Sequence, residues 1–231
     1  KIILKTVSTP WTAYSYVDGI DFRHSFNILS NAVGTALYNT GLLFVKNCSF
    51  KNNYTGNTGA GIYNGRTIQV EKCLFYNNKA FSGGGFYNSW TNGWFPAPDA
   101  TIRSSIFSNN YAGYSGGGIR NEGIITVINS LITNNSSTAY TNGGGLNAMS
   151  ANSYTSVTTK IYNSTIANNA GSNIVIWSGK VTILNSIIWG GALSLQNNPV
   201  PNLRYSTIEG LTGYPLVNNS DPMFINPTTG L

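Results

Sequence analysis

One sequence motif is repeated several times in this chain, and that repetition restricts the fold more than any other feature of the sequence. The copy to which the others are compared runs from Ile125 to Asn147, and residues 42–66 form the cleanest coil. An apolar segment leads to an Asn-Ser corner, a second leads to the pair Asn134-Asn135, and a glycine triplet precedes a third segment at Leu146. Periods of about 20 to 50 residues are typical of solenoids, in which each repeat buries its apolar face only against its neighbours.

Asparagine pairs mark the period. The five pairs are Asn52-Asn53, Asn77-Asn78, Asn109-Asn110, Asn134-Asn135 and Asn168-Asn169. Counted between second asparagines (53, 78, 110, 135, 169), the spacings are 25, 32, 25 and 34 residues. Each period is therefore one short turn of chain, and two of the periods carry an insertion. The insertions are SWTNGWFPAPDA (89–100) and NAMSANSYTSVT (147–158).

Each copy also places a small residue five positions before the second asparagine and a large apolar residue two positions after the small one. The small residues are Cys48, Cys73, Ser105, Ser130 and Ser164, and the large ones are Phe50, Phe75, Phe107, Ile132 and Ile166. β-Branched and aromatic residues fill the short runs, and no segment keeps a helical period over three turns. We predict an all-β, right-handed parallel β-helix of about seven to eight coils with three short strands each, in which Phe50, Phe75 and Phe107 stack in one core column.

One repeating architecture predicts one domain over residues 1–231. Within it, 1–19 form a preceding coil or cap, 20–210 form the coils, and 211–231 form a tail or cap that leads to a further C-terminal region. The sequence starts with KIILKTV and stops at NPTTGL. We expect both ends to be cuts in a longer protein.

Stacking of coils gives the unusual residues a structural role. Asn47, Asn129, Asn163 and Asn185 share one corner, where asparagine tolerates a left-handed backbone. Glycine triplets belong where the chain turns tightly. Cys48 and Cys73 occupy the same position in consecutive coils, so we expect buried packing thiols; a disulfide between them stays open, because strand register restricts its geometry.

Composition excludes several classes of function. Charged residues make up only 9% of the chain, against the usual quarter, and the net charge of +6 is spread over scattered lysines and arginines. No nucleic-acid motif, cofactor motif or zinc-ligand spacing is present. The sequence also contains no run of eighteen apolar residues, the length needed to span a membrane. We expect no nucleic-acid partner, no cofactor, no metal and no membrane span.

Catalytic groups are sparse. Hydrolysis of a polysaccharide needs two or three carboxylates across one cleft, whereas the seven acidic residues fall in different coils. Asp18 and Asp21 are the only close pair, and with Arg23 and His24 they form the best catalytic alternative. We predict no catalytic residue and keep the enzyme as the rival hypothesis.

Aromatic residues on the two insertions are the candidate ligand-binding groups. Trp90, Trp94 and Phe95 lie on the first insertion and Tyr154 on the second. Both insertions leave the same corner of nearby coils, and sugar rings stack on exposed aromatic faces. These residues are candidates for binding a glycan; the alternative is that they fold back over the side of the helix.

A second surface is predicted from the residue that stands between the small residue and the large apolar residue in each copy. Alternation turns the side chain at this position outward, yet the position is occupied by Leu74, Ile106, Leu131 and Ile187 in four of the copies. An outward apolar stripe indicates contact with another protein chain, so these four are a candidate assembly face. Burial of the stripe by local loops is the alternative.

The repeat phrases also resemble a known family. GAGIYN (59–64), GGGFYN (83–88) and NSLITNN (129–135) resemble the pectin-lyase-like right-handed β-helices of bacterial surface proteins, and polymorphic outer-membrane adhesins share this phrasing. NSIIWG (185–190), YSTIEG (205–210) and DPMFINPTTG (221–230) look like the end of the repeat region in secreted proteins with a choice-of-anchor domain.

The resemblance implies a secreted or cell-surface protein that is adhesin-like or part of an extracellular structure. Its implied partner is a polysaccharide or a host or cell-surface glycan. The alternative within the same fold is a polysaccharide lyase or glycoside hydrolase.

Overall fold

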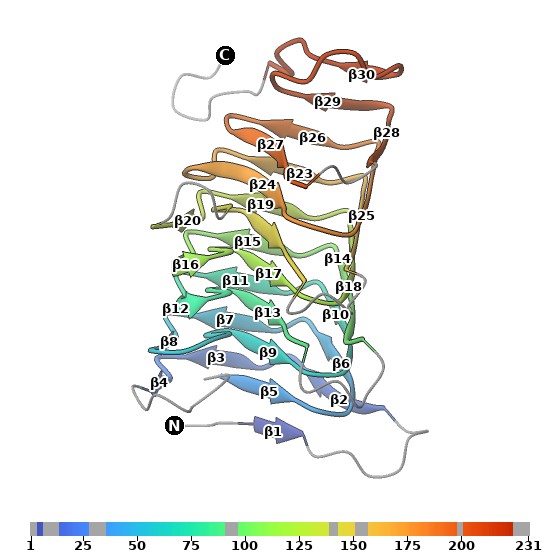
Figure 1. The fold of residues 1–231 in the computed structure, drawn as a ribbon. Helices are drawn as coiled ribbons and strands as arrows, with labels where there is room; N and C mark the ends of the chain where they lie inside the picture. The colour runs from blue at the N-terminus through green and yellow to red at the C-terminus, as the bar shows by residue number, and fades with distance from the viewer. Residues whose placement is uncertain are drawn as a thin grey trace.

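A computed structural model describes residues 4–6, 14–27, 36–90, 97–138, 143–150, 157–197 and 201–223. In this part of the chain all regular structure is β-strand, and every strand pairing is parallel. Coil lies on coil from β1 at one end of the molecule to β30 at the other (Figure 1). The predicted parallel β-helix is confirmed.

Three long sheets run the length of the helix, and we name them A, B and C. Sheet A consists of β1 (Leu4–Thr6), β5 (Leu37–Asn39), β9 (Ile62–Asn64), β13 (Phe86–Asn88), β17 (Ile119–Asn121), β21 (Leu146–Ala148), β24 (Ser172–Ile176) and β27 (Ala192–Leu195). Sheet B consists of β2 (Ser15–Asp18), β6 (Leu42–Lys46), β10 (Thr67–Glu71), β14 (Asp99–Arg103), β18 (Ile124–Ile128), β22 (Thr158–Tyr162), β25 (Lys180–Leu184) and β28 (Pro201–Arg204). Sheet C consists of β3 (Asp21–Arg23), β7 (Ser49–Lys51), β11 (Leu74–Tyr76), β15 (Ile106–Ser108), β19 (Leu131–Thr133), β23 (Thr165–Ala167), β26 (Ile187–Trp189), β29 (Ser206–Ile208) and β30 (Val217–Asn218).

A fourth sheet, which the sequence did not predict, joins sheets C and A in five consecutive coils. This sheet D consists of β4 (Phe26–Asn27), β8 (Tyr54–Thr55), β12 (Lys79–Ser82), β16 (Tyr111–Ser115) and β20 (Ser136–Ser137). Its strands fall between the asparagine pair and the glycine triplet, a stretch that the repeat pattern indicated only as a loop. The three predicted strands of each coil are those of sheets A, B and C.

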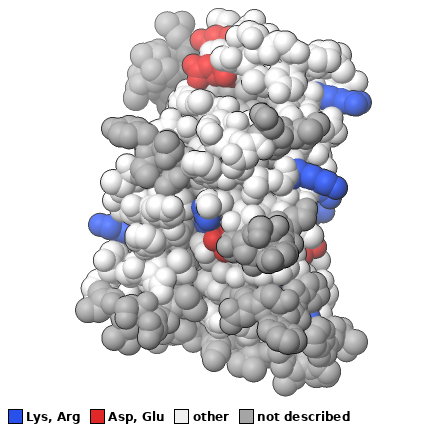
Figure 2. Space-filling model, viewed as in Figure 1, with Lys and Arg blue, Asp and Glu red and all other residues white. Residues whose placement is uncertain are grey.

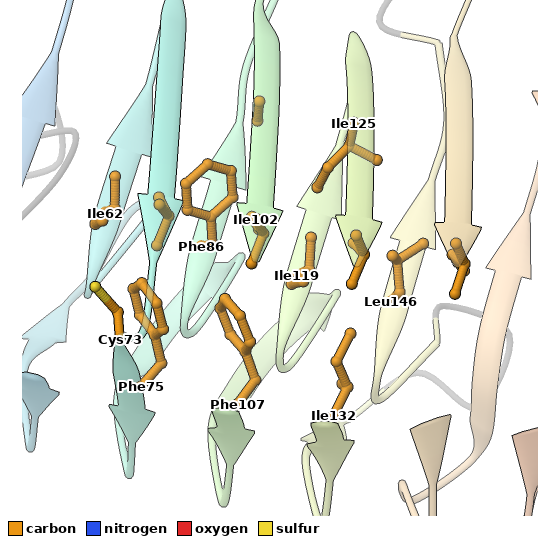
Figure 3. Close-up of a cluster of buried hydrophobic side chains, with 14 of the residues drawn as sticks. Ile62, Cys73, Phe75, Phe86, Ile102, Phe107, Ile119, Ile125, Ile132 and Leu146 are labelled. Atoms are coloured by element: carbon orange, nitrogen blue, oxygen red, sulfur yellow. The ribbon is translucent and has the colours of Figure 1, made fainter. Parts of the chain in front are cut away.

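The core is a set of columns of like side chains. Phe22, Phe50, Phe75 and Phe107 stack with ring centroids 4.9, 4.8 and 4.2 Å apart, and the last three are fully buried. Figure 3 shows Phe75 and Phe107 side by side on consecutive strands, followed by Ile132. The predicted phenylalanine column is confirmed, because parallel register repeats each inward position at every coil.

The corners follow the same logic. Asn47, Asn129, Asn163 and Asn185 have φ angles of 51°, 50°, 49° and 52°, as predicted for their shared corner. The first asparagine of each pair is left-handed as well, as in Asn52 with a φ of 55°. Asparagine adopts this conformation at lower cost than most residues, so the sequence marks both corners in advance.

Second asparagines of the pairs turn inward and form a ladder of amides. Their side-chain amides bond from coil to coil: Asn53 to Asn78 at 2.8 Å, Asn78 to Asn110 at 2.8 Å, Asn110 to Asn135 at 2.9 Å and Asn135 to Asn169 at 2.9 Å. All five are buried. A buried amide without partners is costly, so the ladder needs a partner at each end: Asn53 accepts from the Ser25 backbone N–H, and Asn169 donates to Asn173 at 2.8 Å.

The small residues form a second inner ladder. The Ser105 amide N–H donates to Ser130 Oγ at 3.1 Å, and the Ser105 hydroxyl donates to the Arg103 carbonyl oxygen at 2.8 Å. Cys48 and Cys73 extend this ladder as free, buried thiols. Cys73 Sγ lies 3.2 Å from the Glu71 carbonyl oxygen, the position that a serine hydroxyl takes elsewhere. The packing interpretation of these cysteines therefore describes the structure.

Candidate functional site

Among the described residues, the outer surface of sheet D presents a group of exposed and partly exposed aromatic side chains. Since the second asparagine of each pair points inward, alternation turns the next residue outward. In β8, Tyr54 is outward and Thr55 is buried; in β12, Lys79 is outward and Ala80 is buried. We call the outward residues the aromatic face; they are Phe26, Tyr54, Lys79, Phe81, Tyr111 and Tyr114.

One row of the aromatic face follows the helix axis. Strand register aligns Phe26 with Tyr54, Tyr54 with Lys79, and Lys79 with Tyr111. The rings of Phe26 and Tyr54 stack with centroids 5.1 Å apart and an interplanar angle of 19°. Lys79 Nζ lies 5.8 Å from the Tyr54 ring centroid and 5.1 Å from that of Tyr111. The ammonium group is therefore held between two aromatic rings.

A second row lies beside the first. Phe81 and Tyr114 stack at 5.4 Å with an interplanar angle of 5°. Phe26 is 59% exposed, Phe81 52% and Tyr114 45%, whereas Phe50 and Phe75 inside the same coils are fully buried. Exposed phenyl rings held in an ordered stack on a rigid sheet are a feature of ligand-binding surfaces.

Amide side chains border the aromatic rings. The exposed first asparagines of the pairs lie two residues before the aromatic row, on the corner between sheets C and D. Asn77 Nδ2 donates to Asn52 Oδ1 at 2.7 Å, and Asn52 Nδ2 lies 3.4 Å from His24 Nε2. At the far end of the row, the Tyr111 and Thr138 hydroxyls share a hydrogen bond of 2.7 Å. Rings beside amides and hydroxyls provide the two contacts that sugars use, apolar stacking and hydrogen bonding.

The predicted glycan-binding residues of the insertions give a different picture. Trp90 lies two residues after the end of β13 and is partly buried, and its indole Nε1 is buried without a hydrogen-bond partner. Trp94, Phe95 and Tyr154 lie outside the described residues. The role of these four in glycan binding stays a prediction.

A buried polar cluster on the outer side of sheet A escaped the sequence reasoning. Arg120 and Glu122 are only 6% and 8% exposed and form an ion pair at 3.2 Å. The Tyr87 hydroxyl donates to Glu122 Oε1 at 2.8 Å, and Arg120 Nη1 donates to Ser115 Oγ at 3.1 Å and to Asn147 Oδ1. Each charge is compensated inside the cluster, so the arrangement suits structural support of sheet A better than catalysis.

The pKa values of two tyrosines beside this cluster, Tyr63 and Tyr87, are shifted by their surroundings. Burial raises the pKa of Tyr63 to about 12. The pKa of Tyr87 is raised too, first by burial and then by the negative charge of Glu122. Both phenols therefore stay neutral at physiological pH and serve as hydrogen-bonding groups.

The catalytic alternative is brought together only in part. Asp21, Arg23 and His24 line a pocket of about 500 Å³ at the first described coil. Asp21 accepts hydrogen bonds from Ser49 Oγ and Arg23 Nη2, and the Ser49 bond, followed by the Arg23 contacts and Lys51, lowers its pKa. A carboxylate that binds its proton this weakly is a poor general acid or base at neutral pH.

Asp18, the fourth member of that alternative, makes a different contact. Its carboxylate accepts a hydrogen bond from Asn47 Nδ2 at 2.9 Å, at the exposed corner between sheets B and C. In the described part of the chain, no three His, Cys, Asp or Glu residues are grouped so that they could hold a metal ion. Over the same residues, no helix has the length and apolar character needed to cross a membrane.

The candidate assembly face lies in one column, as alternation predicts. Register aligns Leu74, Ile106, Leu131 and Ile187 on the outer side of sheet C, with Thr165 between the last two. Ile106 is 43% exposed and the other three are half-buried. Its use as a contact for another protein chain stays a prediction.

Charge is sparse on the surface as a whole. On the side shown in Figure 2, residues other than Lys, Arg, Asp and Glu make up most of the described surface, and the few charged groups are scattered.

The sequence did contain a signal for the aromatic face, because Tyr54, Lys79 and Tyr111 each directly follow an asparagine pair. It is visible once the copies are aligned on their pairs.

Comparison of the chain with protein-family models, with curated proteins and with solved structures finds no match. The fold and the geometry of its surfaces are therefore the basis on which a function is assigned.

Proposed function

We propose that this chain belongs to a non-catalytic, secreted or cell-surface β-helix protein, adhesin-like or part of an extracellular structure, that binds glycans. The observation that carries the proposal is the aromatic face of sheet D, whose rings are held in register and of which Phe26, Phe81 and Tyr114 are about half exposed. The resemblance of the repeat phrases to bacterial pectin-lyase-like surface proteins supports export and a glycan partner.

Rigidity favours binding on this face. β8, β12 and β16 each pair with a strand on both sides and fix all the rings of the face except Phe26, which lies on the edge strand β4. A ligand that stacks on the rings therefore loses little free energy to ordering of the protein. The bordering amides of Asn52 and Asn77 add hydrogen-bonding groups without any movement of the backbone.

A glycan array probed with the purified chain, followed by calorimetry on the hits, tests the proposal. The double variant Phe81→Ala with Tyr114→Ala should weaken binding more than tenfold, about 1.4 kcal/mol or more. Tyr16→Ala is the matched control, because Tyr16 stacks on Phe44 at 5.7 Å on sheet B, away from the aromatic face. Equal binding by the double variant and the control would reject the aromatic face.

The insertion keeps its own test. Trp90→Ala with Trp94→Ala should weaken binding more than tenfold if the predicted loop residues contact the glycan. Loss of binding in this variant but not in the Phe81 and Tyr114 variant would move the site from sheet D to the insertion.

A polysaccharide lyase or hydrolase is the second candidate, favoured by the pocket that Asp21, Arg23 and His24 line. Incubation with pectin, alginate or chondroitin would then release unsaturated or reducing sugar ends. Asp21→Asn or His24→Ala should abolish that release. Measured release that depends on these residues would replace the binding proposal by the enzyme.

A further inference from the structure

The shape of the aromatic face restricts the ligand further. The row from Phe26 to Tyr111 crosses the four neighbouring strands β4, β8, β12 and β16, which corresponds to three strand spacings, or about 14 Å. The second row, Phe81 and Tyr114, lies only two to three residues further along the strands, about 7 to 10 Å away. The face is thus longer along the helix axis than across it.

The charge of the face is also one-sided. Lys79 lies at the centre of the first row, between Tyr54 and Tyr111. The strands of sheet D contain no aspartate or glutamate. Among the described residues no carboxylate forms an ion pair with Lys79. Its positive charge is therefore not neutralised by the protein.

Two lysines of sheets B and C show the opposite arrangement. Lys46 pairs with Glu71 at 3.4 Å and Lys51 lies 4.0 Å from Asp21. Lys79 instead lies over the ring faces of Tyr54 and Tyr111, which attract its cation without cancelling its charge. A ligand that carries a negative group would therefore meet an exposed ammonium that two rings hold in place.

From these observations, and resting on the glycan-binding function proposed above, we propose that the ligand is a linear, negatively charged polysaccharide that lies along the helix axis over β4 to β16. Its sugar rings stack on the aromatic rows, and one of its carboxylate or sulfate groups binds Lys79. Exposed amides of the corner between sheets C and D bond to its hydroxyl groups.

The test compares charged and neutral forms of the same backbone. Oligogalacturonates of increasing length, their methyl esters, chondroitin and chondroitin sulfate are titrated into the protein by calorimetry. The charged oligomers should bind more tightly as they lengthen, up to a chain of about 14 Å, with little gain beyond. Methyl esterification and added salt should weaken binding, since both remove the attraction to Lys79. Tighter binding of chondroitin sulfate than of chondroitin would assign the group at Lys79 as sulfate, and equal binding would assign it as carboxylate.

Variants of Lys79 separate charge from shape. Lys79→Gln should weaken binding of the charged oligomers about fivefold, the effect of an exposed ion pair of about 1 kcal/mol, and Lys79→Arg should restore it. Lys180→Gln is the matched control, because this exposed lysine of sheet B contributes the same charge on another face.

The outcomes distinguish the two proposals. Equal binding of acid and methyl-ester oligomers, or equal effects of Lys79→Gln and Lys180→Gln, would overturn the inference about charge while glycan binding stands. Full affinity for a monosaccharide would overturn the axial chain. No binding to any glycan on the array, charged or neutral, would overturn the proposed function itself.

Discussion

Two aromatic ladders occupy the same coils of this protein, one inside the helix and one outside it. Phe50, Phe75 and Phe107 stack inward from sheet C and are fully buried. Phe26 with Tyr54, and Phe81 with Tyr114, stack outward from sheet D; Phe26, Phe81 and Tyr114 are exposed and Tyr54 is partly exposed. The spacing between coils sets the geometry of both ladders, so the main difference between them is that one is buried in the core and the other faces water. The difference teaches that alternation decides whether a repeated ring stabilises the fold or remains available to a ligand.

Replacing a phenylalanine by alanine in the buried ladder and in the exposed ladder should show the largest difference between the two. Phe75→Ala leaves a cavity in the core column and should lower the free energy of unfolding by about 3 to 5 kcal/mol. Phe81→Ala removes only a stack on Tyr114 and should cost about 0.5 to 1.5 kcal/mol. Chemical denaturation measures both; a loss under about 1 kcal/mol for Phe75→Ala would mean that the column does not support the core.

Glycines give a second inside-outside pair. A methyl group on Gly117 would lie 2.7 Å from the Gly144 carbonyl oxygen and still closer to that of Ser136, both backbone atoms. Gly117→Ala should therefore destabilise the protein by about 3 kcal/mol. At Gly113, on sheet D, the nearest atom would be 3.9 Å away, so Gly113→Ala should be neutral or stabilise by up to about 1 kcal/mol. Thermal unfolding of the two variants should separate them clearly, and similar melting temperatures would contradict the close approach of coils at the triplet.

Neighbouring asparagines sharpen the comparison at a single corner. Asn110 is buried and its side chain makes four hydrogen bonds, to the Asn78 amide groups, Phe75 and Asn135. Asn110→Ala leaves these partners unsatisfied and should cost about 2 to 3 kcal/mol. Asn109 is exposed with a φ of 56°, so Asn109→Ala should cost about 1 kcal/mol and Asn109→Gly nothing. Denaturant titration of all three would show whether the ladder or the backbone angle matters more.

Tyr63 is an intermediate case, since it points outward and is nevertheless buried. Its pKa is raised to about 12, chiefly by burial, whereas an unfolded tyrosine titrates near 10. The contribution of the Tyr63 phenol to the free energy of unfolding is fully present below pH 10 and falls between pH 10 and 12, because the phenol loses its proton at lower pH in the unfolded chain than in the folded one. Tyr63→Phe should reduce this fall by about 1 kcal/mol at pH 11. Unfolding curves at pH 8 and pH 11 measure the difference, and an unchanged fall would mean that Tyr63 titrates normally.

Much of the fold could be predicted because its rules are local and repeated. The asparagine pairs gave the period, and alternation then assigned Phe75 to the core and Leu74 to the outside, as the structure has them. Sheet D was missed because β8 and β20 have only two residues each. Runs that short show no alternation, and only their pairing with longer neighbours such as β16 makes them strands.

The candidate site was harder to predict for a different reason. Trp90 and Trp94 attracted attention as large aromatics on an insertion, while Tyr54, Lys79 and Tyr111 differ in type and are far apart in the chain. Only the register between coils brings them together. The buried pair of Arg120 and Glu122 gave no signal either, because in the sequence both are only members of the scattered charged residues.

The amide ladder has a consequence for how such a chain can change in length. Asn53, Asn78, Asn110 and Asn135 each donate toward the next coil, so the four junctions between the coils that contain an asparagine pair use the same atoms. A whole repeat could be duplicated or deleted by recombination and the new neighbours would still recognise each other. Loss of a single asparagine leaves a mismatch that no adjacent coil can repair. Within the laddered coils the chain can thus gain or lose length in units of one turn, whereas a point change at the ladder leaves buried groups without partners.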